Sequence, residues 1–133
     1  MSHFLKTLGR AGWSLPDAWL EDEGAARRLR RTAFPRRPRM APGDRLVYYA
    51  AGWKAVIAVV EVVAPPTDED PLWPRWPWSV EVEPLLAVPL VSNAPPIEAL
   101  GIPPRSMSQQ SHIRISEQQY ARAVEAIASV AAS

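Results

Sequence analysis

The feature that most constrains this chain is a long apolar run that directly follows a turn. "KAVIAVVEVV" (54–63) has only two charged residues in ten, and "RLVYY" (45–49) precedes it across a loose turn. Pro42-Gly43-Asp44 indicates a turn before the first segment, and Pro65-Pro66 ends the second. A strand that is apolar on both sides needs cover on both faces. The hairpin therefore predicts a β-barrel or a covered sheet.

Shorter segments on either side of the hairpin predict further strands. "FLKTL" (4–8) and "SHIRI" (111–115) have the character of short strands. In "SVEVEPLLAVPLV" (79–91), valines alternate with glutamates, so one face points inward and the other toward solvent. Because proline cannot donate to a central ladder, Pro84 and Pro89 confine the continuation of this strand to an edge or a bulge.

Two segments predict helices, one near each end of the chain. "LPDAWLEDEGAARRLRR" (15–31) has its acids early and its arginines late, an order that complements the helix dipole. Gly24 weakens the middle of this helix or divides it in two. Near the C-terminus, Ser116 and Gln119 form a capping box. The apolar stripe of the helix that follows consists of Tyr120, Val124, Ile127 and Val130.

Together these elements predict an α+β fold, a small mixed β-barrel of five or six strands with flanking helices, as a single domain over residues 1–133. A chain of 133 residues is long enough to bury one core without staples. The sequence has no cysteine, which excludes disulfides and thiolate sites. No apolar run approaches the roughly 20 residues of a membrane helix. We therefore expect a soluble cytoplasmic protein without a membrane partner.

The residues that carry catalysis in other proteins are scarce. There is no P-loop, no dinucleotide-binding glycine motif, no zinc-protease motif and no nucleophile elbow. His3 and His112 are the only histidines, too few for a histidine-rich metal site. Asp68, Glu69 and Asp70 are consecutive, so they cannot all face one ion, and a solvated loop is the better interpretation. We predict neither an enzyme nor a metal or cofactor site.

The arginines are concentrated in one segment. "RRLRRTAFPRRPR" (27–39) holds seven arginines and no acid, although the net charge of the chain is only +1. Such a segment would neutralise phosphates and bind nucleic acid without reading its sequence. The alternative is a solvated helix end followed by a linker, but seven arginines exceed what that role needs. The predicted phosphate-binding residues are Arg30, Arg31, Arg36, Arg37 and Arg39.

Three of the six tryptophans lie in one proline-rich stretch, "DPLWPRWPWSVEVE" (70–83). Period-two alternation places Trp78 on the face of the valines that follow it, so we expect it in the core. Trp73 and Trp76 are either a packing corner between prolines or the walls of a pocket. Aromatic walls stack on bases at roughly 1–3 kcal/mol each, so the second interpretation points to a nucleic-acid base.

The order of these segments resembles the EVE domain, a branch of the PUA-like superfamily that is similar to YTH domains. The resemblance rests on "RMAPGDRLVYYA", on "AVIAVVEVVAPP", on the aromatic loop entering "WPWSVEVEPL", and on "RSMSQQSHIRISEQQYARAVEAI". It covers about residues 3–130. The sequence departs from the family pattern in two places: Phe34 stands where a larger cage aromatic is usual, and the first strand opens with His3-Phe4 instead of Tyr-Trp.

The resemblance implies a barrel of five or six strands whose aromatic pocket binds a modified base, such as a methylated cytosine or adenine. It assigns the pocket walls to Phe34 and to Trp73 or Trp76. Polar groups that would read the base edge are Ser106, Ser108 and Gln109, with Asn93 a weaker candidate. Selectivity that rests on one methyl group is worth roughly 1–3 kcal/mol.

Two other functions remain open at this point. The fifteen prolines and the tryptophans beside them could present a surface to a protein partner. A PUA-like domain could also bind RNA without preferring a modified base. The leading prediction is a non-enzymatic module that binds DNA or RNA carrying a modified base, with the arginines on its backbone.

Overall fold

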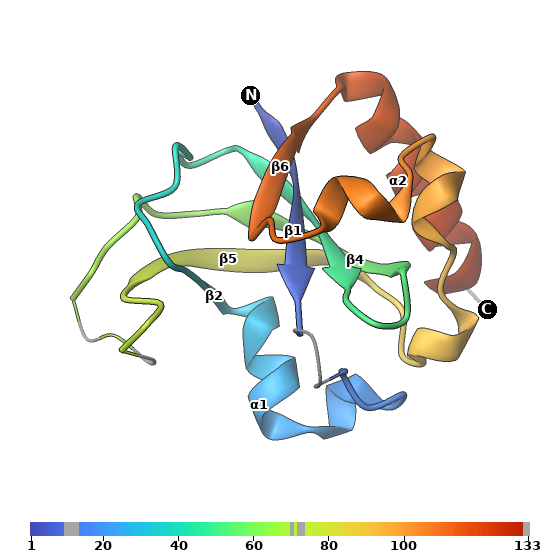
Figure 1. Cartoon of the computed structure of the whole chain (residues 1–133), viewed down its shortest axis with the longest axis horizontal. Coiled ribbons are helices and arrows are strands. Elements are labelled where there is room, and N and C mark those ends of the chain that lie inside the picture. The colour runs from blue at the N-terminus through green and yellow to red at the C-terminus, as the bar shows by residue number, and fades with distance from the viewer. Residues whose placement is uncertain (10–13, 70, 72–73, 132–133) are drawn as a thin grey trace.

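Six strands form one mixed sheet that curls into a half-barrel (Figure 1). The computed structural model describes residues 1–9, 14–69, 71 and 74–131. The strand order is β2-β5-β4-β3-β1-β6; β1 runs parallel to β3, and the other neighbours are antiparallel. The strands are β1 (His3–Leu8), β2 (Arg31–Phe34), β3 (Arg45–Ala50), β4 (Ala55–Val62), β5 (Trp78–Ala87) and β6 (His112–Ile115). This is the α+β, PUA-like fold that the sequence predicts.

Both faces of the curled sheet are apolar, as the run in β4 requires. One hydrophobic cluster fills the inside of the curl and includes Phe4, Trp19 and Phe34. A second cluster lies on the outside and includes Leu5 and Ile127. Successive residues of a strand point to opposite faces, so Phe4 and Leu5 belong to different clusters. The central strands are therefore buried on both sides, and the prediction of a covered sheet is confirmed.

Helix α2 (Glu117–Ala131) covers the outer face of the sheet and lies at the right of Figure 1. The predicted capping box is present, because the Ser116 Oγ accepts from the Gln119 N–H at 3.0 Å and the Gln119 side chain accepts from the Ser116 N–H at 2.8 Å. The predicted stripe faces the outer cluster, with Ile127 fully buried and Tyr120 packed beside it.

The segment predicted as one helix over residues 15–31 is broken. It forms a 3-10 turn at Trp19–Glu21, the short helix α1 (Glu23–Ala26) and a second 3-10 turn, η2 (Arg27–Leu29). The chain then enters β2 instead of continuing as a helix or a linker. Four residues are too few for a visible alternation, and their strand conformation comes from pairing with β5, in which Phe34 lies opposite Trp78.

Pro84 of the fourth predicted strand lies at a bulge, as expected, and β5 ends at Ala87, before Pro89. The pairing of β4 with β5 shifts register where Val60 lies opposite Pro84 and Val59 opposite Leu86. Leu85 is therefore the extra residue of a bulge, and its side chain is exposed. Gly101 ends the 3-10 turn Ile97–Leu100 with a positive φ of 77°.

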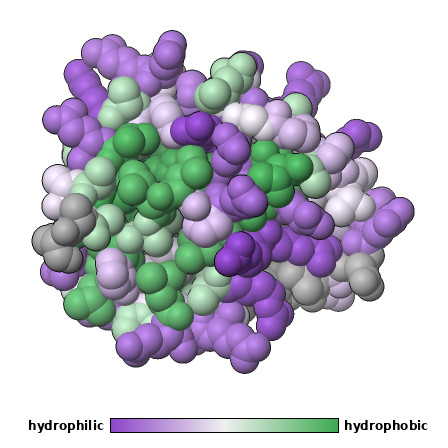
Figure 2. Space-filling view, turned by 180° about the vertical axis from the view of Figure 1, so that it is seen from behind, coloured by the Kyte–Doolittle hydropathy of each residue, from purple (hydrophilic) through white to green (hydrophobic). Residues whose placement is uncertain are grey.

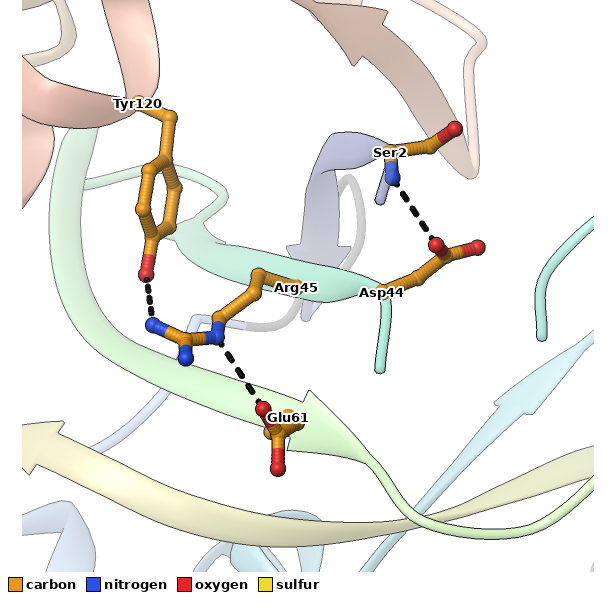
Figure 3. Close-up of polar contacts among 5 residues, drawn as sticks. All are labelled: Ser2, Asp44, Arg45, Glu61 and Tyr120. Carbon is orange, nitrogen blue, oxygen red and sulfur yellow. Dashed lines mark hydrogen bonds and ion pairs between the residues drawn. The ribbon is translucent and has the colours of Figure 1, made fainter. Parts of the chain in front are cut away.

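A polar network ties the first strand, the hairpin and α2 together (Figure 3). The Arg45 guanidinium donates to Glu61 Oε1 at 3.2 Å and to the Tyr120 hydroxyl at 2.8 Å, and these contacts raise the pKa of Arg45. Asp44 accepts from the backbone N–H of Ser2 at 2.8 Å. These contacts connect the residue before β1, the β3–β4 hairpin and α2 at the end of the sheet where β1 begins.

Candidate nucleic-acid interface

A cavity of about 570 Å³ opens at the end of β1, between η2, β2 and the loop that precedes β5. We call it the Lys6 cavity. Its floor is buried and its rim, which includes Pro74 and Arg75, is exposed. Its lining residues are Lys6, Thr7, Leu8, Gly9, Arg28, Thr32, Ala33, Pro74, Arg75 and Trp76.

Lys6 lies on the floor of the cavity, on the inner face of β1 between Phe4 and Leu8. Its side chain is 2% exposed, and its Nζ donates to the backbone carbonyl of Thr7 at 2.9 Å. The Nζ also lies 4.8 Å from the ring centre of Phe34 and 5.0 Å from that of Trp76. Burial, helped by the charge of Arg28, lowers the pKa of Lys6 to about 7.

The aromatic residues predicted for the pocket have different positions. Trp76 lines the cavity and is half-buried, as expected for a wall. Phe34 is fully buried and is not among the lining residues; it lies behind Lys6, against the ring of His112. Trp73 lies outside the described residues. The Lys6 ammonium lies near both rings, but no contact between the rings of Trp76 and Phe34 is found. The described residues therefore form no aromatic cage.

The polar residues predicted to read a base edge are not among the residues that line the cavity. Ser106 is half-buried, and Ser108 and Gln109 are exposed. Gln109 has a positive φ of 60°, and the turn that it forms leads to Gln110, whose carbonyl accepts from the Thr7 hydroxyl at 3.2 Å. This contact connects the turn to the rim. Asn93 is exposed in a separate 3-10 turn.

The predicted phosphate-binding arginines flank the strand that forms one wall of the cavity. Arg30 directly precedes β2, and Arg36, Arg37 and Arg39 follow it; all four are exposed. The guanidinium of Arg37 lies 5.4 Å from the ring centre of Trp78, which is half-buried against the inner cluster.

Arg31 has a structural role in addition. Its Nε donates to the Ser79 hydroxyl at 2.8 Å, and one terminal nitrogen donates to the Glu69 carbonyl at 3.3 Å. These contacts join the edge strand β2 to β5 and to the loop that precedes β5.

Of the lining residues, the sequence prediction named only Trp76; the polar and charged residues that it missed include Lys6, Arg28 and Thr32. The signal for Lys6 was available, because alternation in "FLKTL" places it on the same face as Phe4 and Leu8. Thr32 gave no comparable signal, since β2 was not predicted, and Arg28 belongs to the arginine-rich segment but was not assigned to the pocket. Among the described residues, no group of three metal-ligating side chains is close enough together to hold an ion. No helix in the described ranges has the length and apolar character needed to cross a membrane.

Comparison with known proteins shows similarity at the level of structure. No protein-family model matches this chain, and no curated protein sequence matches it. The solved structure of Rpa0253 from Rhodopseudomonas palustris matches with a TM-score of 0.58 and 14% identity, over 98% of this chain and 95% of that one. PSPTO5229 from Pseudomonas syringae matches with a TM-score of 0.56 and 12% identity, over 93% and 98%.

A YTH domain also matches, that of Mmi1 solved in a complex with RNA. Its TM-score is 0.62 at 11% identity, and the match covers 95% of this chain and 77% of that one. At these identities the matches establish a shared architecture. The chain therefore shares its fold with these bacterial proteins and with the Mmi1 YTH domain, as the resemblance to EVE domains predicts.

Proposed function

We propose that this chain is a non-enzymatic nucleic-acid-binding module in which the Lys6 cavity receives a modified base. The observation that carries the proposal is the position of this cavity beside the arginine-rich segment. Strand β2 contributes Thr32 and Ala33 to the cavity wall, and exposed arginines stand immediately before and after the strand. A strand of nucleic acid held by these arginines would pass the mouth of the cavity.

The size and lining of the cavity support a flat ligand. Small-molecule sites range from about 300 to 1,000 Å³, and this cavity lies within that range. Trp76 offers the aromatic face on which an extruded base stacks. Leu8 and Ala33 add apolar surface to the lining. Phe34, behind Lys6, supports the floor instead of forming an open wall.

The shared fold supports the same class of ligand. The Mmi1 YTH domain that matches this chain was crystallised with RNA. In the proposed complex, Arg30, Arg36, Arg37 and Arg39 contact phosphates, while Arg31 holds β2 in place. Ser108 and Gln109 precede Gln110, whose carbonyl accepts from the Thr7 hydroxyl in the cavity lining, and in the proposed complex they contact the nucleotides next to the extruded base.

A salt titration of oligonucleotide binding tests this function. For single strands, each neutralised phosphate contributes roughly −0.7 to the slope of log K against log salt. We expect Arg36→Gln with Arg39→Gln to weaken binding to plain and modified strands alike and to reduce the slope by about 1.4. The control is Arg105→Gln with Arg122→Gln, which removes equal charge from exposed residues outside this segment. Absence of binding at low salt, or equal effects of the two pairs, would overturn the proposal.

A protein partner is the second candidate, and exposed apolar surface is the observation that favours it. Figure 2 shows apolar side chains gathered over part of the face opposite to that of Figure 1. Leu85 is 44% exposed and Leu90 is 39% exposed. This candidate predicts a complex that survives nuclease treatment, whereas the nucleic-acid proposal predicts that nuclease removes whatever copurifies with the chain.

A further inference from the structure

Lys6 is a buried cation to which no described acidic side chain is paired. The ion pairs among the described residues join Arg27 to Glu23 and Arg45 to Glu61, and neither involves Lys6. The charged neighbour that acts on Lys6 most strongly is another cation, Arg28. Buried charges are normally paired, because removing an ion from water is costly.

The other groups that face Lys6 do not supply the missing negative charge. His112 lies opposite Lys6 on β6, and burial lowers its pKa, with a further contribution from Lys6 itself. Tyr48 lies opposite on β3; burial raises the pKa of its phenol, whose hydroxyl donates to the Arg28 carbonyl. Arg75 adds another cation at the rim. One ammonium hydrogen is directed to the Thr7 carbonyl, so two remain for a ligand.

Thr32 provides a second, independent observation in the same cavity. Its side chain is 1% exposed and lines the cavity from β2. Its hydroxyl lies near that of Tyr48 and influences the pKa of Tyr48, but no hydrogen bond of normal geometry satisfies Thr32 Oγ1 within the described part of the chain. Buried polar atoms without partners are rare in folded proteins and call for an explanation, such as a ligand.

We propose that the Lys6 cavity binds a planar ring bearing a negatively charged oxygen group, with that group on the floor between Lys6 and Thr32 and the ring against Trp76. The ammonium would supply the countercharge and the threonine hydroxyl a hydrogen bond. Charge-assisted bonds of this kind are about twice as strong as neutral ones. The ring itself would contact Trp76 and the apolar side chains of Leu8 and Ala33.

This inference rests on the proposed function for the source of the ring, a nucleic-acid base, and it specifies the modification. A carboxylated pyrimidine has the required shape and charge. A methylated base has an apolar group instead, which would leave the ammonium and the hydroxyl without partners. Groups left unpaired in this way produce strong discrimination between otherwise similar ligands.

The test compares single-stranded oligonucleotides that differ at one central base. Fluorescence anisotropy would measure the Kd for strands carrying cytosine, 5-methylcytosine, 5-hydroxymethylcytosine or 5-carboxylcytosine at about pH 6.5, below the Lys6 pKa of about 7, so that the ammonium form of Lys6 predominates. We expect the carboxylated strand to bind at least about tenfold more tightly than the methylated strand. The free carboxylated nucleoside, measured by calorimetry, serves as a ligand without a phosphate backbone.

Two variants connect the preference to the cavity floor. Lys6→Met keeps the length of the side chain and removes its charge, and Thr32→Val keeps the shape and removes the hydroxyl. Each should lower the ratio of the Kd of the methylated strand to the Kd of the carboxylated strand toward one. Lys54→Met is the matched control, because Lys54 is the other lysine of the chain and is exposed in the β3–β4 turn.

The outcomes separate this inference from the proposed function. Equal binding of all four strands, or tighter binding of a methylated or hydroxymethylated strand, would overturn the inference and leave nucleic-acid binding intact. Binding of the free nucleoside without binding of any strand would support the cavity assignment and overturn the proposed function. If neither strands nor nucleoside bind, both are wrong. If Lys6→Met does not fold, the Kd values of Thr32→Val for the carboxylated and methylated strands decide whether the cavity floor carries the preference.

Discussion

The rings of Phe34 and His112 meet edge to face, with centres 5.1 Å apart and planes at 89°, although they belong to the two outermost strands of the sheet. Strands β2 and β6 are not paired with each other through their backbones in this strand order. The two edge strands of the curled sheet are therefore held together by side-chain packing. Phe34, predicted as a pocket wall, holds the curl together from inside.

This arrangement predicts a large stability effect for Phe34. We expect Phe34→Ala to lower the free energy of unfolding by about 3–5 kcal/mol, because it removes a fully buried ring and leaves a cavity. Urea denaturation would measure the change. Leu85→Ala is the control at an exposed bulge residue and should cost about 0.5 kcal/mol or less. Similar costs for the two variants would contradict the closing role of Phe34.

Lys6 predicts an unusual dependence of stability on pH. Lysine in an unfolded chain ionises near pH 10.4, whereas the pKa of folded Lys6 is about 7. Between these values the unfolded chain binds the additional proton, so the unfolding free energy rises with pH by about 1.4 kcal/mol per unit. Below about pH 7 the destabilisation is fully present. We expect Lys6→Met to stabilise the protein at neutral pH and to flatten this slope, as measured by urea denaturation across this range. Lys54→Met should leave the slope unchanged, and a slope that survives in Lys6→Met would refute the assignment.

The same titration predicts how ligand binding depends on pH. A negatively charged ring needs the charged form of Lys6, and that form becomes scarce above about pH 7. The Kd of the carboxylated strand should therefore rise by about tenfold per pH unit above this value. His112 is neutral throughout that range, because its pKa is lowered from 6.5. Binding measured by anisotropy in Lys6→Met should lack this pH dependence, and a pH-independent Kd in the unmodified protein would contradict a role for the ammonium.

The Arg45 network predicts coupling between α2 and the hairpin. Tyr120→Phe removes the hydroxyl that accepts from Arg45 and should cost about 1 kcal/mol. The ring would still stack on His3, whose centre is 4.3 Å away. A double-mutant cycle with Arg45→Met would measure the coupling, because the two changes should be less than additive. Strict additivity would show that the contact contributes nothing.

The capping box predicts a local effect on α2. Ser116→Ala removes the acceptor of the Gln119 N–H and should lower stability by about 1 kcal/mol. Ser129→Ala is a suitable comparison, because its hydroxyl donates to a carbonyl inside the same helix and does not cap it. Thermal unfolding should show a clear decrease for Ser116→Ala alone.

The parts of the fold that were predictable carry their signal in adjacent residues. The two-sided apolar run of β4, the valine–glutamate alternation of β5, the bulge at Pro84 and the cap at Ser116 all follow from local rules. β2 was missed because its conformation comes from pairing with β5, 44 to 50 residues further along the chain. A non-local partner of this kind leaves no periodic trace in four residues.

The candidate site was predictable only in part. Trp76 lines the cavity, and Arg30, Arg36, Arg37 and Arg39 are exposed before and after β2, but their roles in binding stay predictions. Phe34 is fully buried and does not line the cavity, because a phenylalanine at a strand end gives no indication of which face of the sheet it will occupy. Lys6 was overlooked because lysine is rarely buried, although its neighbours Phe4 and Leu8 share its face.

The position of β1 has a consequence for how the domain assembles. This first strand lies between β3 and β6, with His3 opposite both Arg45 and Ile115. Forming contacts between residues this far apart in sequence requires large loops to close first. The entropy cost of closing these loops precedes the stabilisation by the contacts, so folding is slow. The strand that carries Lys6 stays unpaired on one side until residues 112–115 arrive, so the floor of the cavity forms only as the whole chain comes together.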